Sequence, residues 1–190
     1  MVKIITVSGL RQSIIESKII IYPTDTLYGI GCNAERDDLV LKVFEIKKRL
    51  LTKPLSVIAP SIEWIYKNCR IEGFLQENAI KSYLPGPYTI ILGKKDKSFL
   101  SLATASGDTI GIRMLNTKMQ KIISKANVPF ITTSVNISGD TRVLKHLNSL
   151  KKEIKEKIDY IVLGNPKEMS FIPSTIIDLT RGKEKKTERI

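Results

Sequence analysis

The sequence predicts an α/β protein in which residues 1–190 form one domain. Its 190 residues are the length of a typical single domain, and 42% hydrophobic with 26% charged residues is a globular composition. Short apolar runs of strand length alternate with segments of helical period, a pattern typical of a largely central sheet with helices packed against it. We find no internal repeat, low-complexity block or linker that would divide the chain.

The first predicted strand comprises residues 19–22, a β-branched run that Pro23 ends. It delivers the polar segment PTDTLYGIG to a loop, and junctions of this kind commonly hold functional groups. A helix follows, with Asp37 or Asp38 as its expected N-cap, because apolar residues recur at helical spacing at Leu39, Val43, Ile46 and Leu50. This helix ends in the basic cluster of Lys47, Lys48 and Arg49.

The rest of the chain continues the alternation of helices and strands. By their apolar periods, helices are expected at residues 62–68, 74–83, 117–125 and 151–157. Strands are expected at residues 55–59, 88–92, 109–114, 130–133, 160–163 and 174–179. The segment Pro85-Gly86-Pro87 forces a turn before one of these strands.

The charge of the chain favours anionic partners. Its 31 basic and 19 acidic residues give a formal charge of +12, which attracts nucleotides and RNA, although a solvated lysine-rich surface gives the same count. No apolar run reaches the roughly 18 residues that cross a bilayer, and the first residues lack a signal-peptide pattern, so we expect a cytoplasmic protein without a membrane partner. Cys32 and Cys69 fit neither a disulfide framework nor a zinc site and are expected to be packing residues.

The familiar catalytic templates are absent from the sequence. His146, the only histidine, lies in a polar stretch without a nucleophile signature, so a histidine-based mechanism is not expected. Neither the GxxxxGKS/T nor the GxGxxG pattern of nucleotide-binding loops occurs. Hydroxyl, amide and charged side chains are instead concentrated at the expected strand ends: Thr24, Asp25, Thr26, Lys47, Arg49, Lys53, Arg113, Thr132, Thr133, Ser134, Asn136, Ser138, Ser174 and Thr175. That set suits a small zwitterion together with a phosphate chain.

These segments together resemble a known enzyme family. In order, YPTDTLYGIG, IKKRLLTKPLSV, PGPYTIIL, TIGIRM, TTSVNISG and PSTIIDL are similar to the blocks of the YrdC-like threonylcarbamoyl-AMP synthases of the short, single-domain type. The resemblance implies a twisted, mostly central mixed β-sheet flanked by helices, with a concave, positively charged cleft. The chain departs from the family pattern at Leu50, where proline is usual, and at Ile58, where many members have histidine.

The resemblance also implies roles for individual residues. Lys47 and Arg49 would be the catalytic cations. L-Threonine would be held by Thr26, Arg113, Thr132 and Ser174. The nucleotide would be bound by Arg49, Lys53, Thr109, Ser134, Asn136, Arg142 and Arg189. No residue is assigned to a metal, and Mg²⁺ would arrive on the phosphates of the substrate ATP.

The implied enzyme is a nucleotidyltransferase that condenses L-threonine, bicarbonate and ATP into threonylcarbamoyl-AMP and pyrophosphate. The product would serve N6-threonylcarbamoyladenosine formation at position 37 of ANN-decoding tRNAs. A carbamate of threonine attacks the α-phosphate, so the protein mainly aligns two anions and neutralises their repulsion. Further partners would be downstream tRNA threonylcarbamoyl-transferase proteins and, by direct contact, tRNA or double-stranded RNA.

Two other interpretations stay open from the sequence. A non-catalytic RNA-binding or ribosome-assembly protein would use the same concave surface, with salt-sensitive RNA affinity and no ATP turnover. A carbamoyl-transferring relative would act on another acceptor, because the choice of acceptor rests on a few pocket contacts.

Overall fold

The structure is a computed structural model that describes residues 2–138, 142–181 and 184–187. Its helices are α1 (Gln12–Ser17), α2 (Asp37–Lys47), α3 (Ile62–Asn68), α4 (Phe74–Tyr83), α5 (Lys118–Ala126) and α6 (Lys152–Lys155). Its strands are β1 (Lys3–Thr6), β2 (Ile20–Pro23), β3 (Tyr28–Gly31), β4 (Ser56–Ile58), β5 (Tyr88–Gly93), β6 (Thr109–Arg113), β7 (Phe130–Ser134), β8 (Tyr160–Leu163), β9 (Thr175–Asp178) and β10 (Lys185–Thr187).

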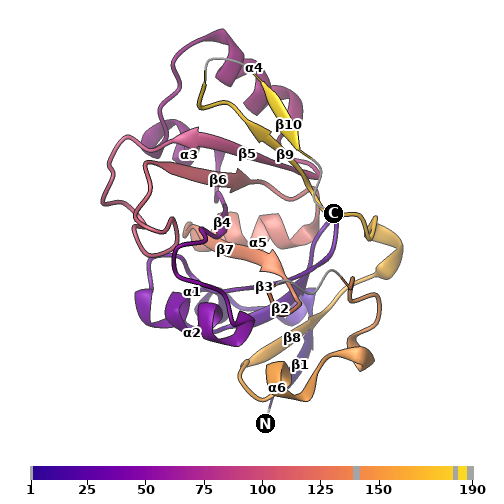
Figure 1. Cartoon of the computed structure of the whole chain (residues 1–190). Coiled ribbons are helices and arrows are strands. Elements are labelled where there is room, and N and C mark those ends of the chain that lie inside the picture. The colour runs from indigo at the N-terminus through magenta and orange to yellow at the C-terminus, as the bar shows by residue number, and fades with distance from the viewer. Residues whose placement is uncertain (1, 139–141, 182–183, 188–190) are drawn as a thin grey trace.

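One mixed sheet contains the strands of the described residues, in the order β1-β8-β2-β3-β7-β4-β6-β5-β9-β10. The neighbours β1 and β8, β8 and β2, β4 and β6, and β5 and β9 run parallel, whereas the other neighbouring pairs run antiparallel. Figure 1 shows β10 and α4 at one end of the sheet and β1 and α6 at the other. This arrangement confirms the predicted α/β fold with a central mixed sheet flanked by helices.

Two hydrophobic clusters attach the helices to the sheet. The larger cluster combines buried residues of α2, α3 and α4 with the sheet, and the smaller one combines α1 and α5 with the sheet. Alternate residues of β2, together with Ile19, which precedes it, divide between the two clusters. Ile19 and Ile21 belong to the larger cluster, while Ile20 and Tyr22 belong to the smaller. A strand buried on both faces explains the uninterrupted apolar run in the sequence.

The loop after β2 is shorter than the sequence predicts. Tyr28–Gly31, expected to lie within a polar loop, forms β3 and pairs with both β2 and β7. Its two glycines make the strand hard to predict, because glycine is unusual inside strands. Glycine is nevertheless needed at position 31, because a Cβ there would overlap the carbonyl oxygen of Ile131. The central position of β3 between two strands therefore depends on residues that usually argue against a strand.

Helix α2 differs from the prediction at both ends. Asp37 and Asp38 lie in its first turn, and the N-cap position is held by Arg36, whose guanidinium pairs with Asp38 at 2.9 Å. The helix ends at Lys47 because Lys48 adopts a left-handed conformation with φ of 50°. Leu50 consequently lies beyond the helix and is 65% exposed, where the periodicity placed it on the buried face.

Besides β3, three short strands or α-helices were not predicted: β1, α1 and β10, each of six residues or fewer. Among the described residues, no helix is long and apolar enough to cross a membrane.

Cys32 and Cys69 are buried free thiols, and burial raises the pKa of both, to about 12 for Cys69. Their burial agrees with the predicted packing role.

Candidate functional site

A cleft of about 590 Å³ lies over the middle of the sheet and is lined from β3, β4, β5, β6, β7 and β9. Its floor is hollow because small residues occupy one row of register. These small residues are Thr132 of β7, Ser56 of β4 and Gly111 of β6, which lie opposite one another on neighbouring strands, and the larger Ile91 of β5 ends the row. A Cβ at Gly111 would lie 3.1 Å from Ser56 Oγ, so the glycine keeps this row open. The volume is that of a typical small-molecule site.

The cleft gathers most of the residues that the sequence proposes for the site. The family resemblance gives roles to twelve residues, and eleven of them line the cleft: Thr26, Lys47, Arg49, Lys53, Thr109, Arg113, Thr132, Ser134, Asn136, Arg142 and Ser174. Arg189, the twelfth, lies outside the described residues. Among the described residues that line the cleft, five are basic and none is acidic.

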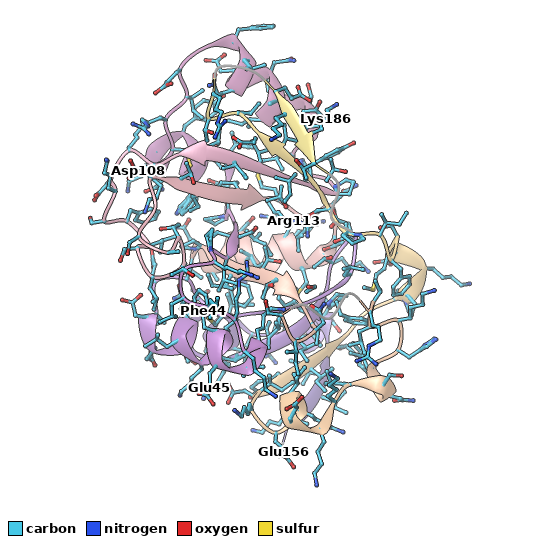
Figure 2. All side chains as sticks on the ribbon, in the orientation of Figure 1. Phe44, Glu45, Asp108, Arg113, Glu156 and Lys186 are labelled. Atoms are coloured by element: carbon cyan, nitrogen blue, oxygen red, sulfur yellow. The ribbon has the colours of Figure 1, made fainter. Side chains whose placement is uncertain are left out.

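Arg113, the last residue of β6, is a buried cation of the cleft. Its side chain is 8% exposed, and Figure 2 shows it in the interior, away from the periphery where Glu45, Asp108 and Glu156 lie. The guanidinium donates to Asp25 Oδ1 at 2.6 Å and to Thr26 Oγ1 at 3.2 Å from each terminal nitrogen. Burial lowers the pKa of Arg113, and the Asp25 carboxylate opposes that shift.

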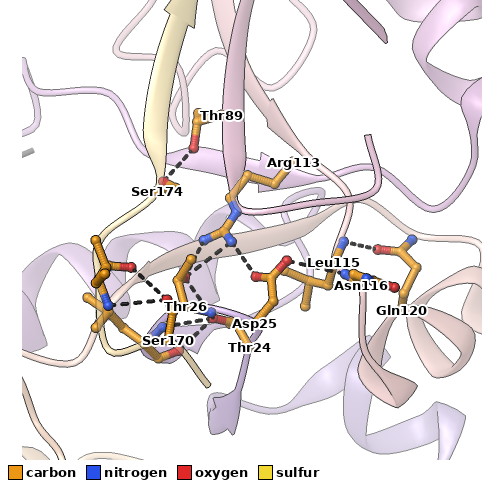
Figure 3. Close-up of polar contacts among 12 residues, drawn as sticks. Thr24, Asp25, Thr26, Thr89, Arg113, Leu115, Asn116, Gln120, Ser170 and Ser174 are labelled. Carbon is orange, nitrogen blue, oxygen red and sulfur yellow. Dashed lines mark hydrogen bonds and ion pairs between the residues drawn. The ribbon is translucent and has the colours of Figure 1, made fainter. Parts of the chain in front are cut away.

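The hydroxyl of Thr26 takes its direction from a chain of hydrogen bonds. Thr24 Oγ1 donates to the carbonyl oxygen of Leu27 at 2.6 Å and lies 3.0 Å from Thr26 Oγ1. The single proton of Thr24 is used by Leu27, so Thr26 donates to Thr24 and accepts from Arg113. Figure 3 shows this network, which fixes the groups without a bound ligand.

Ser174 forms the wall of the cleft beside Arg113. Its hydroxyl lies 2.9 Å from that of Thr89 on β5, and both side chains are buried. The segment that carries Ser174 is held to the loop after β2, because Ser170 N donates to Asp25 O at 3.1 Å and Phe171 N donates to Thr26 O at 2.9 Å. We call Thr26, Thr89, Arg113 and Ser174 the Arg113 cluster.

Lys47, the last residue of α2, is bonded to the loop after β7. It is 3% exposed, and its ammonium donates to the carbonyl oxygens of Ser134 and Asn136, the latter at 2.7 Å, and to Asn136 Oδ1 at 3.3 Å. Ser138 N donates to Lys47 O at 2.8 Å. Lys47 therefore shapes the SVNIS loop as well as contributing charge to the cleft.

Arg49 and Lys53 border the cleft on the loop after α2. The guanidinium of Arg49 donates to Lys53 O at 3.0 Å and to Pro54 O at 2.9 Å, which closes this loop around the side chain. Partial burial lowers the pKa of Arg49. Lys53 and Arg142 are exposed at the cleft. We call Lys47, Arg49, Lys53 and Arg142 the Arg49 cluster.

Several lining residues were missed by the sequence reasoning, notably Ser56, Thr89 and Ile91. Each lies inside a predicted strand. Alternate side chains of a strand point to the same face, and this two-residue period is the signal that would have placed them at the cleft. Ile58 is fully buried in the smaller hydrophobic cluster and does not line the cleft. His146 is exposed. The described residues contain no group of three His, Cys, Asp or Glu side chains suited to a metal ion.

Comparison with known proteins identifies the family. The sequence profile Sua5_yciO_yrdC, described as "Telomere recombination", matches residues 12–189. The chain belongs to the Sua5/YciO/YrdC family. This confirms the family resemblance given by the six segments.

Members of the Sua5/YciO/YrdC family resemble the chain in both sequence and structure. A protein of Methanocaldococcus jannaschii named "Putative threonylcarbamoyl-AMP synthase" is 39% identical over 90% of this chain and 78% of its own. P. abyssi Sua5 complexed with L-threonine superposes with a TM-score of 0.79 at 25% identity, over 97% of this chain and 56% of that one. This chain thus spans about half of that Sua5. E. coli YciO, at 20% identity and a TM-score of 0.81 over 100% of this chain and 95% of its own, shows the fold alone.

Proposed function

We propose that the chain is an L-threonylcarbamoyladenylate synthase, which condenses L-threonine, bicarbonate and ATP. The observation that carries this proposal is the cleft itself. It holds the buried Arg113 cluster, suited to a small amino acid, together with the Arg49 cluster, suited to phosphates. The names of the related synthases and the complex of Sua5 with L-threonine support the same reaction.

In this reaction the threonine amine condenses with bicarbonate to a carbamate and water. A carbamate oxygen attacks the α-phosphorus of ATP, and the bond from that phosphorus to the bridging oxygen breaks, which releases pyrophosphate. Arg113 and Thr26 would hold the threonine carboxylate, with Thr132 and Ser174 against the rest of the molecule. Such positioning converts a meeting of two anions into a reaction within one bound complex.

Arg49 and Lys53 would neutralise the phosphate oxygens, and Thr109, Arg142 and Arg189 would contact the nucleotide. Lys47 would act through the loop that it bonds, by holding Ser134 and Asn136 in place for the nucleotide. Magnesium would come with ATP and offset the charge of its phosphates, and no carboxylate of the described residues lines the cleft to hold the ion. The labile adenylate would pass to tRNA threonylcarbamoyl-transferase proteins, with tRNA as the final acceptor.

The test is pyrophosphate release from ATP and bicarbonate by the purified protein with L-threonine, with L-serine and without an amino acid. Threonine-dependent release that Arg49→Ala reduces is the expected result. Release without an amino acid, or with an unrelated acceptor only, would favour the carbamoyl-transferring alternative. RNA binding with no release under any condition would favour the non-catalytic alternative.

A further inference from the structure

Asp25 is a largely buried carboxylate that the proposed reaction does not use. Its side chain is 11% exposed, and it does not line the cleft, whereas its neighbours Thr24 and Thr26 do. Figure 3 shows Asp25 and Ser174 on opposite sides of the Arg113 guanidinium. Asp25 therefore contacts Arg113 from the side away from Ser174.

The geometry fixes both partners of this pair. One oxygen of Asp25 accepts from Arg113 Nη2 at 2.6 Å, and the other accepts from Asn116 N at 3.3 Å. The guanidinium is held in turn by Thr26, so neither group depends on a ligand for its orientation. The Nε–H of Arg113 is buried and has no hydrogen-bond acceptor among the described residues, which leaves Asp25 and Thr26 as the groups that set the guanidinium plane.

The pair also changes the charge of the cleft. Asp25 cancels the charge of Arg113, while no carboxylate of the described residues lines the cleft beside Lys47, Arg49, Lys53 and Arg142. A buried guanidinium without its counterion would attract any small anion, because charges interact strongly in a medium of low dielectric constant. A neutralised guanidinium remains a hydrogen-bond donor but loses that general attraction.

We propose that Asp25 is a positioning and specificity-determining residue, which orients Arg113 and neutralises it so that the Arg113 cluster accepts a zwitterionic amino acid and discriminates against simple anions. A zwitterion and the Asp25–Arg113 pair both have no net charge, whereas the phosphates of ATP would meet the Arg49 cluster, where no carboxylate of the described residues lines the cleft. The identity of the amino acid as threonine rests on the proposed function. The discrimination against simple anions rests on the pair alone.

The test compares Asp25→Asn with Asp159→Asn. The first change keeps the size of the side chain and an oxygen for Asn116 but removes the charge. The second is a matched control, because Asp159 Oδ2 accepts from a backbone donor, Ile19 N, at 2.9 Å and does not line the cleft. Pyrophosphate release is measured against L-threonine and against ATP, with and without sodium acetate at constant ionic strength.

For Asp25→Asn we expect kcat/KM for L-threonine to fall roughly tenfold or more, the effect of a lost hydrogen bond between charged groups. Acetate should become a competitive inhibitor against L-threonine, with an inhibition constant about tenfold below that of the wild type, as expected for an uncompensated charge in a buried site. The KM for ATP and all constants of Asp159→Asn should stay at wild-type values. A folded Asp25→Asn with wild-type threonine kinetics and acetate sensitivity would overturn the proposal, as would an equal change in the KM for ATP.

Two further measurements separate this proposal from other failures. If Asp25→Asn does not fold, Asp25→Ser is tested in its place, and loss of the folded state in both variants would make the pair structural and overturn the proposal. Calorimetric titration of L-threonine and of acetate needs no turnover. If the wild type releases no pyrophosphate, the proposed function fails, while tighter acetate binding by Asp25→Asn than by the wild type would still support the role of Asp25.

Discussion

The two clusters of the cleft use cations in different ways. In the Arg113 cluster one cation is buried, paired with Asp25 and held by Thr26, so its position is set before a ligand binds. In the Arg49 cluster Lys47 is buried on backbone oxygens, while Lys53 and Arg142 are exposed. A neutral, rigid site and a cationic, partly open site therefore share one cleft. The neutral site suits a zwitterion, and the cationic site suits an anion.

Removing Arg113 tests the buried cluster with the largest expected effect. Arg113→Ala leaves the Asp25 carboxylate buried without a counterion, so unfolding free energy should fall by about 3 kcal/mol. Threonine-dependent turnover should fall roughly 100-fold or more, because a charged hydrogen-bond donor is also lost. Denaturant unfolding and pyrophosphate release measure the two losses.

Its control is Arg36→Ala, which removes the exposed ion pair with Asp38. This variant should keep the unfolding midpoint and the turnover of the wild type. Similar losses of stability and turnover in both variants would show that the buried Arg113–Asp25 pair contributes no more than the exposed Arg36–Asp38 pair.

Substitutions of Lys47 and Lys53 compare a cation that holds a loop with a cation that only adds charge to the cleft. Lys47→Met removes the ammonium that donates to the carbonyl oxygens of Ser134 and Asn136, at an expected cost of about 2 kcal/mol in unfolding free energy. Lys53→Met, at an exposed position, should leave stability unchanged. Chemical denaturation of the two variants decides the point, and equal stability of both would mean that Lys47 does not hold the loop.

Arg49 is expected to act on the nucleotide alone. Arg49→Ala should raise the KM for ATP about tenfold through loss of a charge-assisted contact, and leave the KM for L-threonine unchanged. Steady-state kinetics with each substrate varied in turn give both constants. A matching rise in the KM for L-threonine would argue against two separate clusters.

Salt should produce the smallest difference between the clusters. Raising the ionic strength screens exposed charges, so ATP binding should weaken several-fold, whereas binding of L-threonine at the buried, neutral pair should hardly change. Calorimetric titration of each ligand at low and high salt makes the comparison. Equal salt dependence would contradict the assignment of the net charge to the Arg49 cluster.

The fold was largely predictable because its strands are continuous apolar runs. Residues 62–68 and 74–83 were predicted as helices and form α3 and α4 with those bounds. The exceptions have local causes. The glycines of β3 hide a central strand, and the left-handed Lys48 ends α2 before Leu50, a conformation that apolar period does not encode.

The sequence predicts which residues gather at the cleft better than it predicts the contacts among them. Eleven of the proposed residues do line one cleft, because their segments end at neighbouring strands. The partners of the cations were not predicted. Asp25 and Arg113 are 88 positions apart in sequence, and Lys47 bonds backbone oxygens of a loop, so neither contact follows from spacing alone. Such pairings depend on the order of strands, which local pattern does not determine.

A kinetic comparison of Thr26→Val and Lys53→Met with the wild type tests most directly whether the Arg113 cluster binds L-threonine and the Arg49 cluster binds ATP. Thr26→Val removes the hydroxyl that accepts from Arg113 and nearly preserves the volume of the side chain. We predict threonine-dependent pyrophosphate release by the wild type, a raised KM for L-threonine alone in Thr26→Val, and a raised KM for ATP alone in Lys53→Met. Wild-type protein without threonine-dependent release, or variants that raise both constants equally, would contradict this assignment.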